Sequence, residues 1–346
     1  MTGRASQAIA LDAMGGDHAP ATTVQGAVEA AERFGLKVLL VGREAVLKRE
    51  LDRLHPRVGG IEIVDAPEVV DMDEAPTATL RAKRNSSMAV ALRLVRDGIA
   101  GAFVTAGNTG AAMVAAKVTL GMVDGVERPA LAATAPGIDR STLIVDVGAN
   151  VDCKPAHLLQ FGIMGHFYAS AVMGVPNPRV GLLSVGEEEG KGDRLTQEAY
   201  RLLADAGLNF IGNVEGRDIY AGTVDVVVCD GFVGNVVLKV SEGLGEMVFK
   251  LLKREAKRSA LSAAGFLLAK GAFAGFRRQV DYAEYGGAPL LGVRGACLVG
   301  HGRSNAKAIR NALRFAHSYA ARGVIESIQR RVAELLRRTG EGSARA

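Results

Sequence analysis

Residues 11–20 read LDAMGGDHAP and follow directly on the apolar residues AIA at positions 8–10. The stretch therefore looks like a buried strand that ends in two glycines, two acids, a histidine and a proline. A simple turn from a strand into a helix needs one glycine at most, because glycine is required only where the backbone is strained or closely approached. The turn is typical of a ligand site, of a metal site, or of a connection with unusually many polar residues.

Short runs rich in Val, Ile and Leu alternate with helical patterns along most of the chain. Runs that are apolar on both faces predict strands covered by helices on both sides, as in a mostly parallel sheet. We therefore expect an α/β fold with a three-layer α/β/α arrangement. The strands predicted from the sequence are 8–14, 37–42, 61–67, 101–107, 129–136, 142–148, 179–186, 209–214, 225–231 and 296–302.

Six of these strands end in glycines accompanied by Asn, Asp, Lys or His. In parallel sheets, ligands bind beyond the carboxyl ends of the strands, where such loops lead into helix N-termini. Six strand ends with glycine and polar residues in one chain favour a shared polar site over six unrelated turns. The loops are LDAMGGDHAP (11–20), VTAGNTGAA (104–112), VDVGANVDCKP (145–155), VGEEEGKGD (185–193), CDGFVGN (229–235) and VGHGRSNA (299–306).

Composition narrows the class of protein. The 346 residues are 48% hydrophobic and only 5% aromatic, with 43 glycines and a net charge of +5. Few aromatics argue against single-stranded nucleic acid as a partner, because that binding relies on stacking platforms. The three cysteines form no CxxC pair, and the first six residues, MTGRAS, lack the apolar region of a secretory signal, so we expect a cytoplasmic protein.

Several familiar motifs are absent from the sequence. The stretch GEEEGKGD lacks the spacing and the Ser or Thr of a Walker loop, no strand leads into GxGxxG, and no GxSxG is present. Asp12, Asp17 and His18 do not match a compact metal-binding loop, so we expect neither a metal nor a cofactor. The remaining chemistry is that of glycine loops, helix N-termini and single polar side chains.

Individual residues in these loops have two interpretations. Gly107 to Gly110 stand at a helix start, where free N–H groups suit an anion or where Asn108 simply caps the helix. Lys191 either neutralises a phosphate or is a solvated surface lysine. Asn235 either donates a hydrogen bond to an oxyanion or belongs to a helix cap.

The segment 250–280 differs from the rest of the chain. A basic helical part precedes an apolar part that is too short to span a bilayer, and a helical hairpin lying in the membrane interface fits both. A dimer interface or a core hairpin is the alternative. The residues expected to contact the membrane are Leu261, Phe266, Leu267, Leu268, Phe273 and Phe276.

Six motifs, taken in order and spacing, resemble one family. They are LDAMGGDHAP, TAGNTGA, DVGANVDCKP, GNVEGRDI, CDGFVGNVVLK and GGAPLLGVRG, and the resemblance covers about residues 8 to 325. The family is that of the bacterial phosphate acyltransferases of phospholipid synthesis, the acyl-acyl-carrier-protein:phosphate transacylases. The resemblance implies transfer of a long-chain acyl group from acyl carrier protein to inorganic phosphate, giving acyl phosphate for a downstream glycerol-phosphate acyltransferase.

The resemblance also implies a homodimer, peripheral attachment to the inner face of the cell membrane, and a fold like that of the isocitrate and isopropylmalate dehydrogenases. We expect one catalytic unit (1–335), a protruding hairpin (250–280) and a disordered tail (336–346). As site residues we assign Lys191 and Asn235 to catalysis. We assign to substrate binding Gly15, Gly16, Asp17, His18, Gly107, Asn108, Thr109, Gly110, Asn150, Lys154, Asp230 and His301.

Phosphate is already an oxyanion at neutral pH, so such an enzyme needs no activated serine, cysteine or metal. Buried carboxylates such as Asp146 would then brace loops or position Lys191, Lys154 and Arg81. Two alternatives stay open: a nicotinamide-dependent dehydrogenase on the same fold, and a membrane-attached scaffold that binds carrier protein without turnover.

Overall fold

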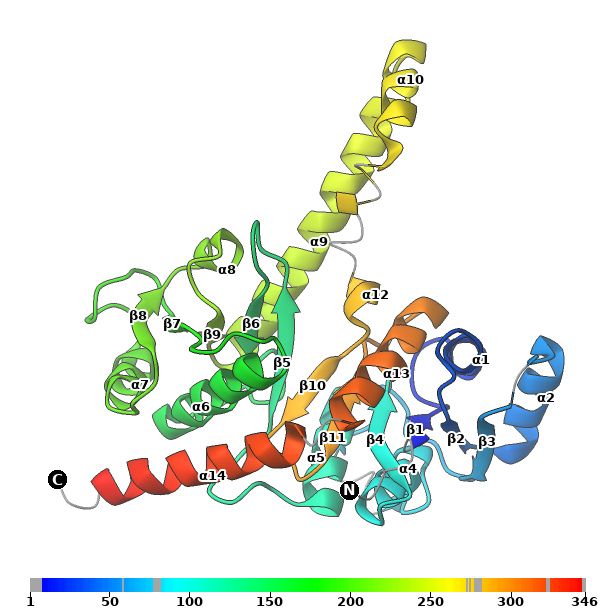
Figure 1. Ribbon diagram of the computed structural model, residues 1–346, viewed down its shortest axis with the longest axis horizontal. Helices are drawn as coiled ribbons and strands as arrows, with labels where there is room; N and C mark the ends of the chain where they lie inside the picture. Colours follow the sequence, from blue (N-terminus) through cyan, green and yellow to red (C-terminus); the bar gives the residue numbers. More distant parts are fainter. Residues whose placement is uncertain are drawn as a thin grey trace.

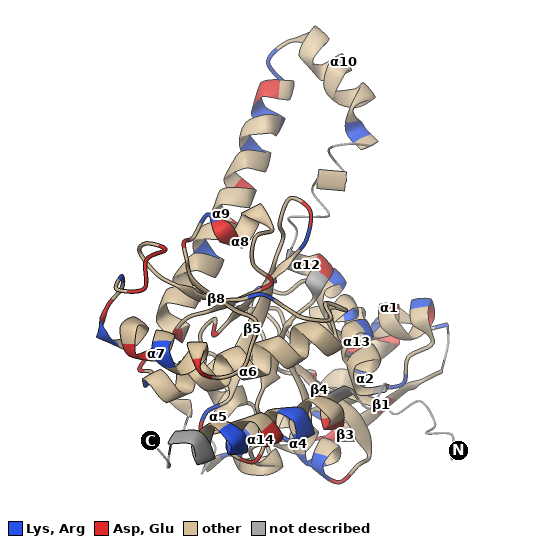
Figure 2. Ribbon diagram, turned by 60° about the vertical axis from the view of Figure 1, so that its left-hand side comes forward, with Lys and Arg blue, Asp and Glu red and all other residues tan. Residues whose placement is uncertain are grey.

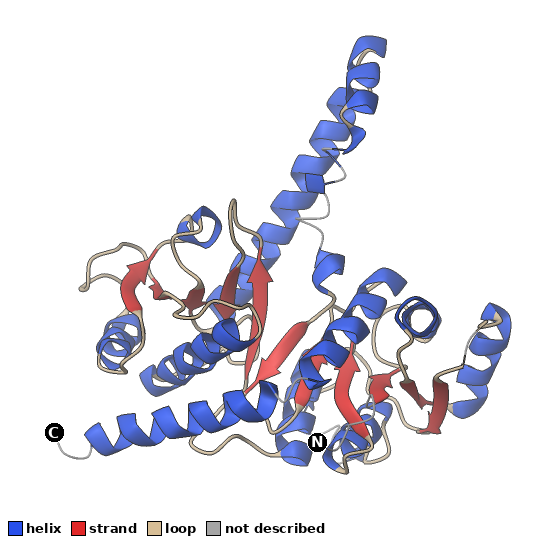
Figure 3. Cartoon of the chain, in the orientation of Figure 1, coloured by secondary structure: helices blue, strands red, loops and turns tan. Residues whose placement is uncertain are grey.

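The computed structural model describes residues 8–57, 59–76, 82–271, 273, 275, 276, 282–321 and 324–343. Its strands form one sheet in the order β3-β2-β1-β4-β11-β10-β5-β6-β9-β7-β8, which runs through the molecule with helices on both sides (Figure 3). The strands are β1 (Ala8–Asp12), β2 (Val38–Gly42), β3 (Ile61–Asp65), β4 (Ala100–Thr105), β5 (Ala130–Ala135), β6 (Thr142–Val145), β7 (Val180–Leu183), β8 (Phe210–Val214), β9 (Val226–Val228), β10 (Ala288–Leu291) and β11 (Ala296–Val299).

Most neighbouring strands are parallel, and helices cover both faces, so the predicted α/β/α class is confirmed. One apolar cluster packs under α1 (Ala21–Phe34), α2 (Glu44–Leu54), α6 (Pro155–Ala171), α7 (Arg194–Ala204), α13 (Ala306–Ala321) and α14 (Val324–Ser343). The other cluster packs under α4 (Ser87–Arg96), α5 (Thr109–Leu120), α8 (Asp218–Ala221) and the first part of α9 (Gly231–Ala256).

The sheet reverses direction in its middle. Strand β10 is antiparallel to both β11 and β5, and β5 is antiparallel to β6. Consequently β6, β9, β7 and β8 run opposite to β3, β2, β1, β4 and β11. Their carboxyl ends therefore point the opposite way from those of β1, β4 and β11, so the strands that lead into the six polar loops do not all run in one direction, as the sequence had suggested.

Two further differences from the sequence-based expectation have simple causes. Strand β10 was not predicted, because it has four residues, includes a proline and follows two glycines. The tail expected from residue 336 is helical as far as Ser343, since α14 extends that far and its Ile328 and Val332 are buried in the core. Packing of one apolar face therefore stabilises a helix that its polar end does not predict.

Helix α9 is the most distinctive element. It starts at the carboxyl end of β9, lies against the sheet and then projects far beyond the body of the molecule (Figure 1). Helix α10 (Ala260–Leu268) packs back along its outer end, and α12 (Tyr282–Tyr285) leads back to β10. Within the described residues, the protrusion expected at 250–280 is therefore present as a helical hairpin.

Candidate active site

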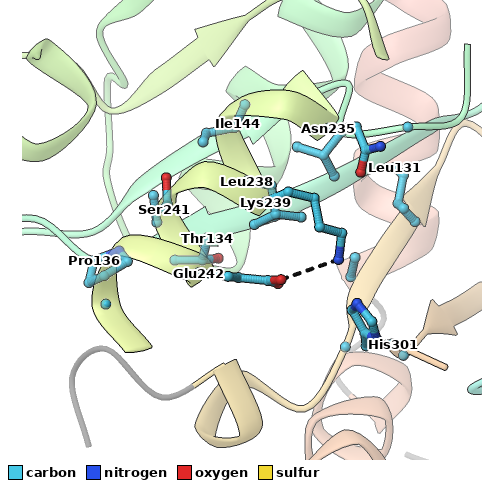
Figure 4. A pocket seen from close by; sticks show the side chains of 18 of the residues that line it. Leu131, Thr134, Pro136, Ile144, Asn235, Leu238, Lys239, Ser241, Glu242 and His301 are labelled. Atoms are coloured by element: carbon cyan, nitrogen blue, oxygen red, sulfur yellow. Dashed lines mark hydrogen bonds and ion pairs between the residues drawn. The ribbon is translucent and has the colours of Figure 1, made fainter. Parts of the chain in front are cut away.

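A cavity of about 890 Å³ lies between α9 and the sheet. Its walls come from β5 and the segment that follows it, from the loop after β6, from α9, and from the residues around β10 and β11. Polar and apolar side chains share its lining, with Asn235, Lys239, Glu242 and His301 near one another (Figure 4). Volumes of this size are typical of small-molecule sites.

Three loops pack tightly beside one end of this cavity, and glycines make the packing possible. A Cβ at Gly15 would lie 2.6 Å from Asp12 Oδ2 and 2.9 Å from the Gly107 nitrogen. The Asp17 N–H donates to the Gly302 carbonyl at 2.8 Å. The loops after β1, β4 and β11 thus meet as predicted, but Gly15, Gly16 and Gly107 hold backbone against backbone and are not part of the cavity wall.

Asp12 fixes the first of these loops. Thr105 Oγ1 donates to its Oδ2 at 2.8 Å, and the Gly107 N–H donates to Thr105 Oγ1 at 2.9 Å. Burial raises the pKa of Asp12, while hydrogen bonds from Ser87, Thr105 and the backbone lower it. The carboxyl group serves as a brace, which is the role the sequence had suggested for it.

Both polar atoms of the Asn108 side chain form structural hydrogen bonds. Its Oδ1 caps α5 by accepting from the Ala111 N–H, and its Nδ2 donates to the carbonyls of Met72 and Glu74 at 3.0 Å each. The side chain therefore pins the 72–74 segment beside the cavity, which Met72 lines. The next residue, Thr109, also lines the cavity, and no hydrogen bond among the described residues uses its N–H.

The loop after β6 is organised by buried Asp146. Its oxygens accept from the N–H groups of Leu131, Gly148, Ala149 and Asn150 and from the Asn150 amide. Burial raises the pKa of Asp146, and these hydrogen bonds lower it. The loop presents Gly148 to Asn235, whose side chain lies 3.7 Å from where a Gly148 Cβ would be.

One face of α9 carries the polar groups of the cavity. Asn235 and Lys239 are four residues apart, and Glu242 follows three residues later, so all three lie on the same side of the helix. Lys239 Nζ lies 3.2 Å from Glu242 Oε2. Asp230 caps the helix by accepting from the N–H groups of Phe232 and Val233, which leaves it a structural role.

His301 completes the polar end. Its Nδ1 accepts the Arg303 N–H at 3.1 Å, so the neutral ring carries its proton on Nε2 and can donate from there. Burial lowers the pKa of His301 and Lys239 lowers it further, Glu242 raises it by less, and Arg303 (lowering) and Asp17 (raising) have the smallest effects. The imidazole is therefore neutral at neutral pH.

The structure separates the remaining predicted residues from this cavity. Lys191 lies in the exposed loop between β7 and α7, against Gly186, and β7 lies beyond β9, toward the outer end of the sheet. The Asn150 side-chain amide donates its hydrogen bonds to the Pro129 carbonyl and to Asp146 Oδ2. The other predicted residues that do not line the cavity are Asp17, His18, Gly110 and Lys154, and Arg81 lies outside the described residues.

Lys239, Glu242 and Ser304 line the cavity and were missed from the sequence. A signal for two of them existed: Lys239 is the last residue of the motif CDGFVGNVVLK, one helical turn after Asn235, and Glu242 follows another turn later. Ser304 also lies in a loop already identified, VGHGRSNA, three residues after His301.

The hairpin exposes large apolar side chains. Leu261, Leu267 and Leu268 are 85%, 69% and 90% exposed, whereas Phe266 stacks on Phe273 with ring centroids 4.2 Å apart. Phe276 is partly exposed and also lines the cavity. No helix among the described residues is long and apolar enough to cross a bilayer.

Solved structures share the fold. A phosphotransacetylase from Streptococcus pyogenes superposes with a TM-score of 0.62 at 14% identity, covering 90% of this chain and 93% of the other. A 4-hydroxythreonine-4-phosphate dehydrogenase from Klebsiella pneumoniae gives a TM-score of 0.54 at 13% identity, covering 93% of this chain and all of the other. At such low identity the likeness concerns architecture alone, and it agrees with the expected dehydrogenase-like fold.

Sequence relatives are far closer. The profile of a family described as "Fatty acid synthesis protein" matches residues 7–327. A phosphate acyltransferase from Trichlorobacter lovleyi is 52% identical over 96% of this chain and 98% of its own length, and one from Pelotomaculum thermopropionicum is 53% identical over 93% and 94%. The chain therefore belongs to the fatty acid synthesis protein family and stands among relatives named phosphate acyltransferase.

Proposed function

We propose that the protein is a phosphate acyltransferase that moves a fatty acyl group from a thioester to inorganic phosphate. The observation that carries this is the cavity itself, in which Asn235, Lys239 and His301 stand at one end of a largely apolar wall. The polar end suits an anion and a carbonyl, and the apolar wall suits a hydrocarbon chain. Membership of the family, with relatives of that name at about half identity, supports the same reaction.

In the proposed reaction, Lys239 and the free N–H at the start of α5 hold phosphate, and the Asn235 amide donates to the thioester oxygen. A phosphate oxygen attacks the carbonyl carbon and forms a tetrahedral intermediate. When the intermediate collapses, the C=O bond re-forms, the C–S bond breaks and the thiolate leaves with the electron pair. The Nε2–H of His301 donates a hydrogen bond to the departing sulfur, and the proton carried by the attacking hydrogen phosphate passes to solvent or to the released thiolate.

The thioester carrier is proposed to be acyl carrier protein, an acidic partner. The outer end of α9 presents Lys253, Arg254, Lys257 and Arg258, and Figure 2 shows charged residues there beside an α10 that bears almost none. Such a basic patch steers an acidic protein and also attracts anionic head groups.

The same hairpin is proposed to attach the protein peripherally to the inner face of the cell membrane. Exposed leucines on α10 suit insertion among acyl chains, and the neighbouring cations suit the head groups. The product, a mixed anhydride of a fatty acid and phosphate, would be consumed by an acyltransferase that uses glycerol phosphate. Attachment to the membrane places that product where the next acyl transfer occurs.

A homodimer through α9 is also proposed. On the side roughly opposite to the cavity, exposed apolar residues recur at intervals of three and four, the spacing of a helix that packs on another helix. A second copy of α9 supplies such a partner by symmetry. The stripe consists of Val233, Val236, Val240, Met247 and Leu251, and Leu244 lies between the stripe and the cavity.

The decisive experiment mixes pure protein, palmitoyl-acyl carrier protein and inorganic phosphate and measures acyl phosphate together with released carrier thiol. We expect both in equal amounts, and no reaction without phosphate. A protein that binds the carrier yet forms no acyl phosphate would support the scaffold alternative. Thermal stabilisation by a nicotinamide dinucleotide would instead support the dehydrogenase, which only similarity of fold favours.

A further inference from the structure

The cavity is much longer than the reacting groups require. Helix α9 lines it from Asn235 to Val248, and thirteen residues at about 1.5 Å each correspond to about 20 Å. An extended hydrocarbon with C–C bonds of about 1.5 Å advances about 1.25 Å per carbon, so about sixteen carbons fill that length. The cavity thus matches a long, unbranched ligand.

Besides Lys239 and Glu242, two polar side chains of the wall, Ser241 and Tyr220, contact each other through their hydroxyl groups. Ser241 Oγ donates to the Val237 carbonyl and contacts the Tyr220 hydroxyl, and Glu242 accepts from Lys239. The opposite wall is β5, where the small side chains of Ala133 and Ala135 leave room beside α9. A ligand in this part of the cavity meets the side chains of Ser241, Tyr220 and Glu242 with their hydrogen bonds already formed.

Large apolar residues at the far end are exposed to solvent. Ile138 is 79%, Leu244 is 54% and Phe276 is 40% exposed, although all three line the same cavity. Exposed apolar surface in a groove is unfavourable unless a ligand covers it. The end of the cavity at Val248 and Phe276 is also the end from which the hairpin projects.

Building on the proposed function, we infer that the acyl chain of the substrate lies along α9, with its carbonyl at Asn235 and its methyl end at Val248 and Phe276. Gly245, which lines the cavity between these ends, is then a determinant of chain length, since a side chain there would enter the channel. Gly245 lies about 15 Å along the helix from Asn235, which corresponds to about twelve carbons.

The test measures kcat/KM for acyl-carrier-protein thioesters of eight to eighteen carbons in the wild type, in Gly245→Phe and in Val248→Trp. Each buried methylene is worth up to about fourfold, so the wild-type value rises with length up to about sixteen carbons. For Gly245→Phe we expect kcat/KM to stop rising at ten to twelve carbons. Its kcat/KM for the sixteen-carbon substrate should be at least tenfold lower than for the ten-carbon one. For Val248→Trp, kcat/KM should stop rising at about fourteen carbons.

Gly243→Phe is the matched control, because Gly243 is on another side of the same helix and a Cβ there meets open space. It should keep the wild-type dependence on length. Two different cut-off chain lengths, the shorter in Gly245→Phe and the longer in Val248→Trp, establish the channel. An unchanged profile in Gly245→Phe or in Val248→Trp, or an equal loss at every length in both, overturns the inference. A wild type inactive on every thioester refutes the proposed function instead.

Discussion

Lys239 and Glu242 form an ion pair on the cavity wall, with 3.2 Å between Nζ and Oε2 and with His301 beside them. The pair is preformed in the structure and stands one helical turn from Asn235. A phosphate ion entering the polar end would compete with Glu242 for the lysine. The ammonium group is therefore held in place by a carboxylate whose charge phosphate can replace.

Replacing Lys239 by Met should lower kcat/KM for phosphate about 10²- to 10³-fold, because a preorganised charge that stabilises the transition state is lost. Lys191→Met is the comparison, since Lys191 lies outside the cavity. It should retain activity within about twofold of the wild type. Steady-state rates at varied phosphate decide the matter, and a loss in Lys191→Met with none in Lys239→Met would restore the assignment made from the sequence.

The free energy of unfolding should fall between pH 7.5 and pH 5.5. Burial is the first cause that lowers the pKa values of His157, His166 and His301, so the folded protein keeps these rings neutral where the unfolded chain protonates them near pH 6.5. The unfolded state then binds more protons, and stability is lost as pH falls.

Urea denaturation at the two pH values measures this slope. His166→Gln should show a shallower slope than the wild type, because one of the three histidines is removed. His166 is suited to the comparison since its Nδ1 is buried without a hydrogen-bond partner among the described residues and it lies outside the cavity. Identical slopes in the two proteins would contradict the explanation.

Asp146→Ala should destabilise the protein by about 3 kcal/mol or more, because several backbone N–H groups of a buried loop lose their acceptor at about 1–3 kcal/mol each. Asp152→Ala, in the same loop but exposed, should change stability by less than about 0.5 kcal/mol. Chemical denaturation of both variants provides the measurement. Equal stability of the two variants would show that Asp146 does not organise the loop.

Leu261→Glu combined with Leu268→Glu should release the protein from vesicles that contain anionic lipid, because two exposed apolar anchors become charged. Val185→Glu alters an exposed valine in the loop after β7 and should leave binding unchanged. Sedimentation with liposomes separates the outcomes. Continued sedimentation of the double variant would mean that another surface contacts the membrane.

The sequence predicted the layers of this fold well, because runs such as KVLLVG at 37–42 are apolar on both faces and that pattern depends only on local residues. The reversal of the sheet was not predictable in the same way. It depends on β10, a four-residue strand with a proline, whose pairing with β5 and β11 is set by tertiary contacts.

The position of each strand in the sheet explains which of the named residues line the cavity. Asn235 and His301 were named from the sequence and both line the cavity, whereas Lys191 was named because its loop follows a strand, without knowledge that this strand lies beyond β9, toward the outer end of the sheet. Lys239 was overlooked although it lies in a motif already identified. The glycines of the first two loops were predicted correctly as points of convergence, but they serve to pack the loops together.

A single helix carries both the reacting groups and the base of the hairpin. From Lys239 to Ala256 there are seventeen residues, about 26 Å of helix. If the hairpin rests on a bilayer as proposed, this length sets the greatest height above the lipid surface at which the anhydride can form. The fatty tail would then already point downward, so that the finished molecule leaves tail first toward the membrane and its phosphate stays on the aqueous side.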